Sequence, residues 1–80
     1  MNNFGLTADQ ADVLAFLKRY HNVNGVFPTV REIAKGQIEG QQVINERKSQ
    51  GTVQGIMNGL VNRQAIERQP GRPRAIRILD

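Results

Sequence analysis

The sequence predicts a small, mainly α-helical domain that ends in a β-hairpin. Two capping-box motifs each precede a segment whose apolar residues recur at helical spacing. A third segment keeps this spacing but contains three glycines at intervals of four residues. Residues 65–79 contain two short alternating runs around a turn signal, as a β-hairpin does. A chain of 80 residues has the length of one small domain.

The first helix is expected from Ala8 to His21. Thr7 is its N-cap, and Gln10 occupies the reciprocal position of a capping box. The asparagine- and glycine-containing residues 22–25 should end it. His21, near the helix C-terminus, is interpreted as a partner of the helix dipole rather than as a catalytic residue. The apolar residues that form one broad face are Ala11, Val13, Leu14, Phe16, Leu17 and Tyr20.

The second helix is expected to begin after Thr29, because Thr29 and Glu32 form a second T-x-x-E capping box. Gly36 can end this helix in the left-handed conformation. The side chains expected to face the core are Val30, Ile33 and Ala34.

Residues 37–50 are polar and glutamine-rich, and their apolar residues are isolated. The sequence predicts an inserted or irregular connection here, with one helical turn near Val43–Arg47. A loop of this length inside a small domain is either functional or mobile.

The third helix is expected from Thr52 to Asn62, with Ser49 or Thr52 as its cap. At 100° per residue its aliphatic residues fall on one side and its glycines on the other. Each glycine costs a helix interior about 0.5–1 kcal/mol relative to alanine. We therefore expect an outward face on which a partner can approach the backbone closely. The aliphatic residues are Val53, Ile56, Met57 and Leu60, and the opposite side holds Gly51, Gly55, Gly59, Gln54, Asn58 and Asn62.

The predicted strands are residues 65–68 and 75–79, joined by a turn at Pro70-Gly71, with Pro73 outside any regular ladder. Arg72 and Arg74 lie at the tip of this hairpin. Three helices followed by a two-stranded wing define a winged helix-turn-helix, α-α-α-β-β. The fold class is thus mainly α with a C-terminal β-hairpin, in one domain over residues 1–80 with its wing at 64–80.

Charge is unevenly distributed along the chain, whose net charge is +4. Residues 47–80 hold seven basic and two acidic residues, whereas residues 1–46 hold four and five. The basic side chains of the second half are nearly all arginine, which suits two-pronged contact with phosphate or guanine. A basic half of a small domain points to a polyanion, although a solvated basic face is the alternative.

Composition argues against an enzyme. The chain has no cysteine and one histidine, which excludes a thiol nucleophile and a thiolate or clustered-imidazole metal site. Its acidic residues are scattered, and it has no glycine-rich phosphate loop with a lysine. We expect no catalytic residues, no metal and no cofactor. Without an apolar run of about 18 residues or a signal peptide, the expected location is the cytoplasm, with no membrane association.

Three segments, LTADQADVLAFLKRY, FPTVREIA and PGRPRAIRIL, closely resemble the DNA-binding domain of LexA-type repressors of the SOS response. The resemblance covers about residues 6–35 and 64–79. It implies a double-stranded DNA binder whose third helix enters the major groove and whose wing touches backbone or minor groove. The excess length, roughly eight residues, falls within residues 35–47, where a tight turn normally fixes the recognition helix.

The resemblance also implies the residues that contact DNA. Gln54 and Asn58 are of a type that can bind adenine with two hydrogen bonds. By position, those near the bases are Ser49, Gly51, Thr52, Gln54, Gly55 and Asn58. Thr29 and Arg31 start a helix that crosses the phosphates, and the arginines of the wing are Arg68, Arg72 and Arg74.

LexA-type repressors continue into a peptidase domain that cleaves its own linker and supplies dimerisation, whereas this sequence stops at Asp80. We therefore expect either a stand-alone repressor without self-cleavage, as would suit a phage or other mobile element, or an excised domain. A homodimer on a palindromic site would compensate for the small size of one module. The alternative function is a winged-helix protein that binds and modulates a host protein.

Overall fold

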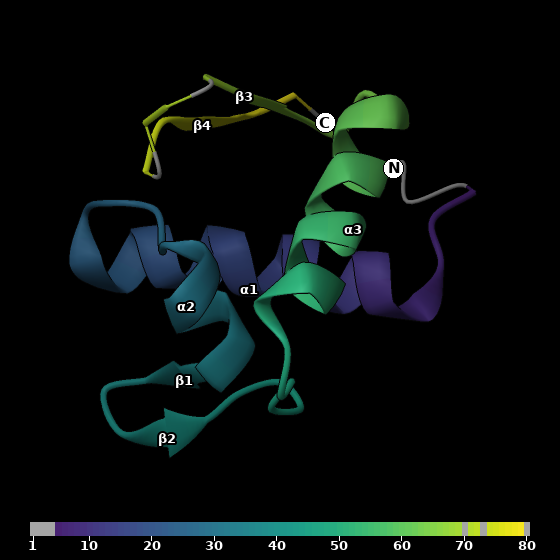
Figure 1. Ribbon diagram of the computed structural model, residues 1–80. Coiled ribbons are helices and arrows are strands. Elements are labelled where there is room, and N and C mark those ends of the chain that lie inside the picture. Colours follow the sequence, from purple (N-terminus) through teal and green to yellow (C-terminus); the bar gives the residue numbers. More distant parts are fainter. Residues whose placement is uncertain (1–4, 70, 73, 80) are drawn as a thin grey trace.

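The computed structural model describes residues 5–69, 71–72 and 74–79. The order of elements confirms the predicted fold class, three helices followed by an antiparallel strand pair (Figure 1). The elements are α1 (Ala8–Asn24), α2 (Val30–Lys35), β1 (Gln37–Ile38), β2 (Gln41–Gln42), α3 (Gln50–Asn62), β3 (Ile66–Arg68) and β4 (Ile76–Ile78).

Both capping boxes are formed as predicted. Thr7 Oγ1 accepts a hydrogen bond from the backbone N–H of Gln10, and Gln10 Oε1 accepts one from the N–H of Thr7. Thr29 and Glu32 repeat this arrangement at the start of α2. Because each box involves residues three apart, local sequence determines both helix starts.

The end of α1 lies beyond the predicted position. The helix continues past His21 to Asn24, and Gly25 ends it with φ of 77° while donating its N–H to the His21 carbonyl. Adding residues to an existing helix costs far less than nucleating one, so the poor helix formers at 22–24 are still accommodated. The glycine that can adopt the left-handed conformation determines the end of the helix.

The core lies where α3 packs across α1 and α2, with β3 beside it. The predicted aliphatic side of α3 is confirmed, since its four apolar residues are all buried. Within the described residues, no helix is both long and apolar enough to cross a membrane. The largest fully buried side chains include Phe16, Leu14, Leu17, Ile33, Met57, Leu60 and Ile66.

The predicted helical turn near Val43–Arg47 is wrong. The connection instead forms the β1–β2 hairpin and then runs to α3 without helix. Gly36 ends α2 with φ of 70°, and its carbonyl accepts hydrogen bonds from the N–H groups of Val43 and Ile44. These bonds draw the returning strand back onto the end of α2. Val43 and Ile44 then pack against the core from extended backbone, which the spacing of two isolated apolar residues could not reveal.

Arg47 anchors the far end of this connection. Its backbone N–H donates to the Ala34 carbonyl at 2.7 Å, and its side chain, only 10% exposed, pairs with Asp9 of α1 at 3.2 Å. The connection is therefore attached to both preceding helices. Figure 1 shows its hairpin beside α2, on the opposite side of the molecule from β3 and β4.

The C-terminal hairpin, here called the wing (residues 66–78), pairs Ile66 with Ile78 and Arg68 with Ile76. Gly71, with φ of 77°, lies in the predicted turn, whereas Pro70 and Pro73 lie outside the described residues. Alternation along the strands places the isoleucines toward the core and leaves the third pair, Glu67 and Arg77, on the opposite face.

Candidate nucleic-acid interface

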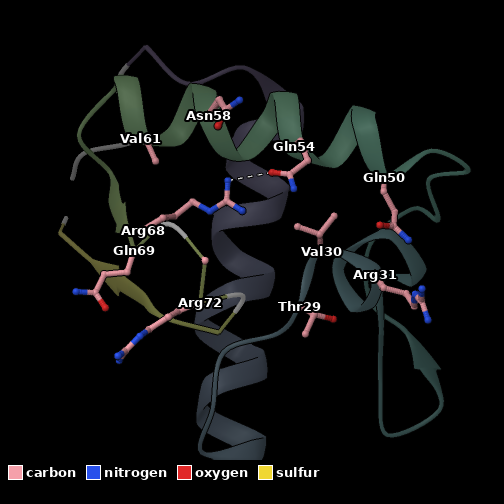
Figure 2. A pocket seen from close by; sticks show the side chains of 11 residues that line it. Thr29, Val30, Arg31, Gln50, Gln54, Asn58, Val61, Arg68, Gln69 and Arg72 are labelled. Carbon is pink, nitrogen blue, oxygen red and sulfur yellow. Dashed lines mark hydrogen bonds between the residues drawn. The ribbon is translucent and has the colours of Figure 1, made fainter.

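An open groove of about 800 Å³ runs between the start of α2, the exposed side of α3 and the wing (Figure 2). Three elements distant in sequence therefore contribute to one concave surface. The residues that line it are Thr29, Val30, Arg31, Gln50, Gln54, Asn58, Val61, Arg68, Gln69, Gly71 and Arg72.

The groove is positively charged. Both regions that line the groove beside α3 supply arginine: α2 supplies Arg31, and the wing supplies Arg68 and Arg72. Among the described residues that line the groove there is no aspartate or glutamate. A concave surface with cations and no carboxylate concentrates a polyanionic ligand.

One face of α3 lines one side of the groove. Gln50, Gln54 and Asn58 follow each other at intervals of four residues, and Val61 follows three later, so all four share a face. Two of them, Gln54 and Asn58, were predicted, whereas Gln50 and Val61 were missed. The same helical periodicity indicates Val61, whereas Gln50 was missed because α3 begins two residues before the predicted Thr52. Val61 is 37% exposed although it is aliphatic.

Gln54 and Arg68 meet across the groove. The Arg68 Nη1 donates a hydrogen bond of 3.1 Å to Gln54 Oε1, which joins the wing to the middle of α3 (Figure 2). Gln54 is exposed and Arg68 is half-buried. Nothing in the separate sequence segments indicated this contact between residues that we had predicted individually.

Thr29 and Arg31 form the α2 side of the groove. Thr29 is half-buried and its hydroxyl caps α2, so its structural role is established by geometry. Arg31 is exposed, and Figure 2 shows it on the side of the groove away from the wing. Arg72 is also exposed and lies on the opposite, wing side of the groove, so both of these sides carry a cation.

Four predicted residues lie in the first turns of α3 and do not line the groove. Ser49 is the N-cap, and its Oγ accepts a hydrogen bond from the Gly51 N–H at 3.1 Å. Gly51, Thr52 and Gly55 are exposed. A Cβ added at Gly55 would meet nothing within 4 Å, so this part of the helix is open to a partner.

The third glycine, Gly59, does not belong to the predicted outward face. It is half-buried, and a Cβ at this position would meet the side-chain amide of Gln10 on α1. Gly59 therefore permits close packing between two helices. The prediction was wrong here because a helical wheel separates polar from apolar sides but does not locate a polar neighbour such as Gln10.

Arg74 makes contacts within the chain that the sequence did not predict. Its guanidinium donates to both carboxylate oxygens of Glu32 and to the Phe27 carbonyl. Burial alone would raise the pKa of Glu32. The Arg74 hydrogen bond, the Thr29 N–H and the Arg74 charge outweigh burial and hold the pKa of Glu32 below its usual value. Among the described residues, no group of three histidine or acidic side chains is placed to hold a metal.

These features define a winged helix-turn-helix domain with a basic groove along its third helix, the class to which DNA-reading winged helices belong. Residues 3–75 match the family model of the LexA DNA binding domain. The chain belongs to this family, and it is a DNA-binding domain.

Relatives with curated descriptions agree. The chain is 30% identical over 79 residues to a LexA repressor of Carboxydothermus hydrogenoformans, covering 99% of this chain and 35% of the relative. It is 36% identical over 75 residues to the LexA repressor of Caldicellulosiruptor saccharolyticus, covering 94% and 33%. For the LexA repressor of Bacillus mycoides the identity is 40% over 74 residues, covering 92% and 32%. The chain thus spans about a third of the length of these relatives.

Proposed function

We propose that the chain binds double-stranded DNA at a specific sequence and represses transcription there. The observation that carries this proposal is the groove itself, which combines an exposed polar helix face with flanking arginines and no carboxylate in its described lining. Base-reading groups and phosphate-binding groups are the two components that specific binding requires.

In this mode α3 lies in the major groove, which is wide enough to admit one helix. Gln50, Gln54, Asn58 and Val61 then face base edges, because they share the exposed side of α3. Arg31 and Arg72 lie on opposite sides of the groove beside this helix and contact the phosphate backbone. Such contacts position the protein without reading sequence.

The first turns of α3 approach the duplex most closely. Ser49 and Thr52 offer hydroxyls, and Gly51 and Gly55 leave the backbone open on an exposed surface. Thr29 supports Arg31 by capping α2. Arg74 acts through the wing, because its guanidinium is already bonded to Glu32 and to the Phe27 carbonyl.

Repression and dimeric binding are part of the proposal. The relatives named above are repressors. One module of this size buries about 600–1,000 Å² on DNA, so full occupancy favours two copies on a palindromic site. Binding to a host protein, the alternative function, would leave the polyanion-attracting groove unexplained.

A selection of duplexes from a random pool tests this function. The expected result is an enriched motif, bound with an affinity that falls with salt by about −0.9 in log–log slope for each neutralised phosphate. Arg31→Ala and Arg72→Ala should each lower that slope by about one phosphate. Arg19→Ala removes the same charge from an exposed position on α1 and should leave the slope unchanged.

Failure to enrich a motif, together with unchanged affinity in Arg31→Ala and Arg72→Ala, would reject the proposed function. Weak, sequence-independent DNA binding alongside a tight stoichiometric protein partner would favour the protein-binding alternative instead.

A further inference from the structure

The hydrogen bond between Arg68 and Gln54 determines which way the Gln54 amide faces. A guanidinium has only donors, so the atom that it contacts at 3.1 Å must be the carbonyl oxygen, Oε1. The amide nitrogen, Nε2, then keeps both of its N–H donors for a ligand, whereas the oxygen keeps only one lone pair. The orientation follows from the chemistry of arginine rather than from the choice between two similar atoms.

This orientation conflicts with the contact first expected for Gln54. To bind adenine with two hydrogen bonds, a glutamine accepts one from the base N6 amino group and donates one to N7. In this chain Arg68 already uses one of the two lone pairs of the accepting oxygen. Gln54 therefore retains its donors and loses much of its capacity to accept.

Together, Gln54 and Arg68 present N–H groups to the groove. Arg68 uses one of its five N–H donors on Gln54 and keeps the others. No carboxylate lines the described part of the groove, so no acidic side chain there competes for these donors. In the major groove, guanine is the base whose edge offers two acceptors, O6 and N7, whereas adenine and cytosine each expose an amino group.

We propose that Gln54 and Arg68 act as one donor pair that selects guanine, and that Arg68 determines this choice by occupying the oxygen of Gln54. The proposal rests on the proposed function, since it names the base read by the same groove. Arg68 is well placed for the task because its stem lies half-buried on β3, opposite Ile76, which restricts its freedom.

The decisive experiment compares motifs selected from random duplexes by the wild-type protein, by Arg68→Met and by Arg19→Ala. Methionine keeps an apolar stem on β3 but removes every donor, which frees the Gln54 oxygen. We expect one guanine position in the wild-type motif to become adenine with Arg68→Met. The other positions should be unchanged, and Arg19→Ala should retain the wild-type motif.

A second measurement needs no variant protein, so it holds even if Arg68→Met fails to fold. Replacing that guanine by 7-deazaguanine removes N7 and preserves base pairing. Affinity of the wild-type protein should fall about ten-fold, within the discrimination of a two-pronged base contact. The same replacement at a guanine outside the motif should have no effect.

Phosphate oxygens are also acceptors, so Arg68 could contact a phosphate instead of guanine. The two contacts predict different effects of Arg68→Met. If Arg68 served a phosphate, Arg68→Met would weaken all sequences equally, reduce the salt slope and leave the motif unaltered. That result, or a wild-type motif in which no guanine responds to 7-deaza replacement, would overturn the inference while leaving sequence-specific binding intact. A pool in which no motif is enriched would reject both.

Discussion

The guanidinium of Arg74 and the carboxylate of Glu32 form a two-pronged ion pair, with N–O distances of 2.9 and 3.2 Å. The pair joins the wing to the first turn of α2. Glu32 Oε1 also accepts the N–H of Thr29, so the same carboxylate caps α2 and holds the wing. Glu32 therefore positions both the α2 side and the wing side of the groove.

Arg74→Gln should loosen the wing. The variant loses the charge-assisted bonds to Glu32, and such bonds are stronger than neutral ones. Amide exchange at Gln69, whose N–H bonds to the Ala75 carbonyl across the wing, should become several-fold faster. Arg77→Gln is the matched control, because Arg77 pairs with Glu67 at 3.7 Å between two exposed side chains. Equal exchange rates in the two variants would contradict the assigned role of Arg74.

Stability should depend on pH through Glu32. Its pKa is lowered in the folded protein, so its contribution is present above the unfolded pKa of about 4.3 and is lost as pH falls through the lower folded value. The unfolding free energy of wild type minus that of Glu32→Gln should be constant near neutrality and shrink below about pH 4.3. Urea titrations at several pH values would measure this difference in unfolding free energy. A difference that increased as the pH fell would contradict a lowered pKa of Glu32 in the folded protein.

Gly55→Ala and Gly59→Ala should differ although both lie within α3. At Gly55 the new methyl meets nothing within 4 Å, so the variant should be more stable by up to about 1 kcal/mol. At Gly59 the methyl meets the Gln10 amide, which must leave the capping box of α1. Losing the Gln10–Thr7 hydrogen bond, worth about 1 kcal/mol, offsets the gain in helix propensity. Thermal or urea unfolding would compare them, and equal stabilisation would contradict the Gly59 contact.

The affinity for DNA is a second property that Gly55→Ala should change. Gly55→Ala should weaken binding despite stabilising the fold, because its methyl lies on the exposed side proposed to approach the duplex. A Gly55→Ala variant with wild-type affinity would remove this residue from the proposed interface.

Glu39→Asn should stabilise the β1–β2 hairpin. Glu39 has φ of 52° and Gly40 has φ of 80°, and a two-residue turn with both values positive favours Asn-Gly. The left-handed conformation costs most residues roughly 1–2 kcal/mol, and asparagine less. We expect a gain of about 0.5–1 kcal/mol in unfolding free energy. Gln41→Asn, on the neighbouring strand, is the control and should give no gain.

Features set by nearby residues were predictable from the sequence. Thr7 and Thr29 begin their helices through partners three residues away, and the apolar side of α3 follows from spacing alone. Gly36, the predicted cap of α2, has the left-handed φ that a cap requires.

Contacts between distant residues were not predictable. Arg74 and Glu32 are 42 residues apart, and Arg68 and Gln54 are 14 apart. Whether an arginine faces solvent, a carboxylate or a glutamine depends on how the wing packs against the helices. Residue type could therefore identify the arginines of the groove as candidates for phosphate binding, but it could not show that Arg74 is already paired with Glu32.

Sequence-specific recognition by α3 is tested most directly by the ratio of two affinities measured at one salt concentration, one for the selected duplex and one for a scrambled duplex of the same composition. A groove that reads bases should bind the selected duplex at least about 10³-fold more tightly, as specific DNA-binding proteins do. Gln54→Ala with Asn58→Ala should reduce this ratio while leaving affinity for the scrambled duplex nearly unchanged. Equal affinities for the two duplexes in the wild-type protein would contradict sequence-specific recognition by α3.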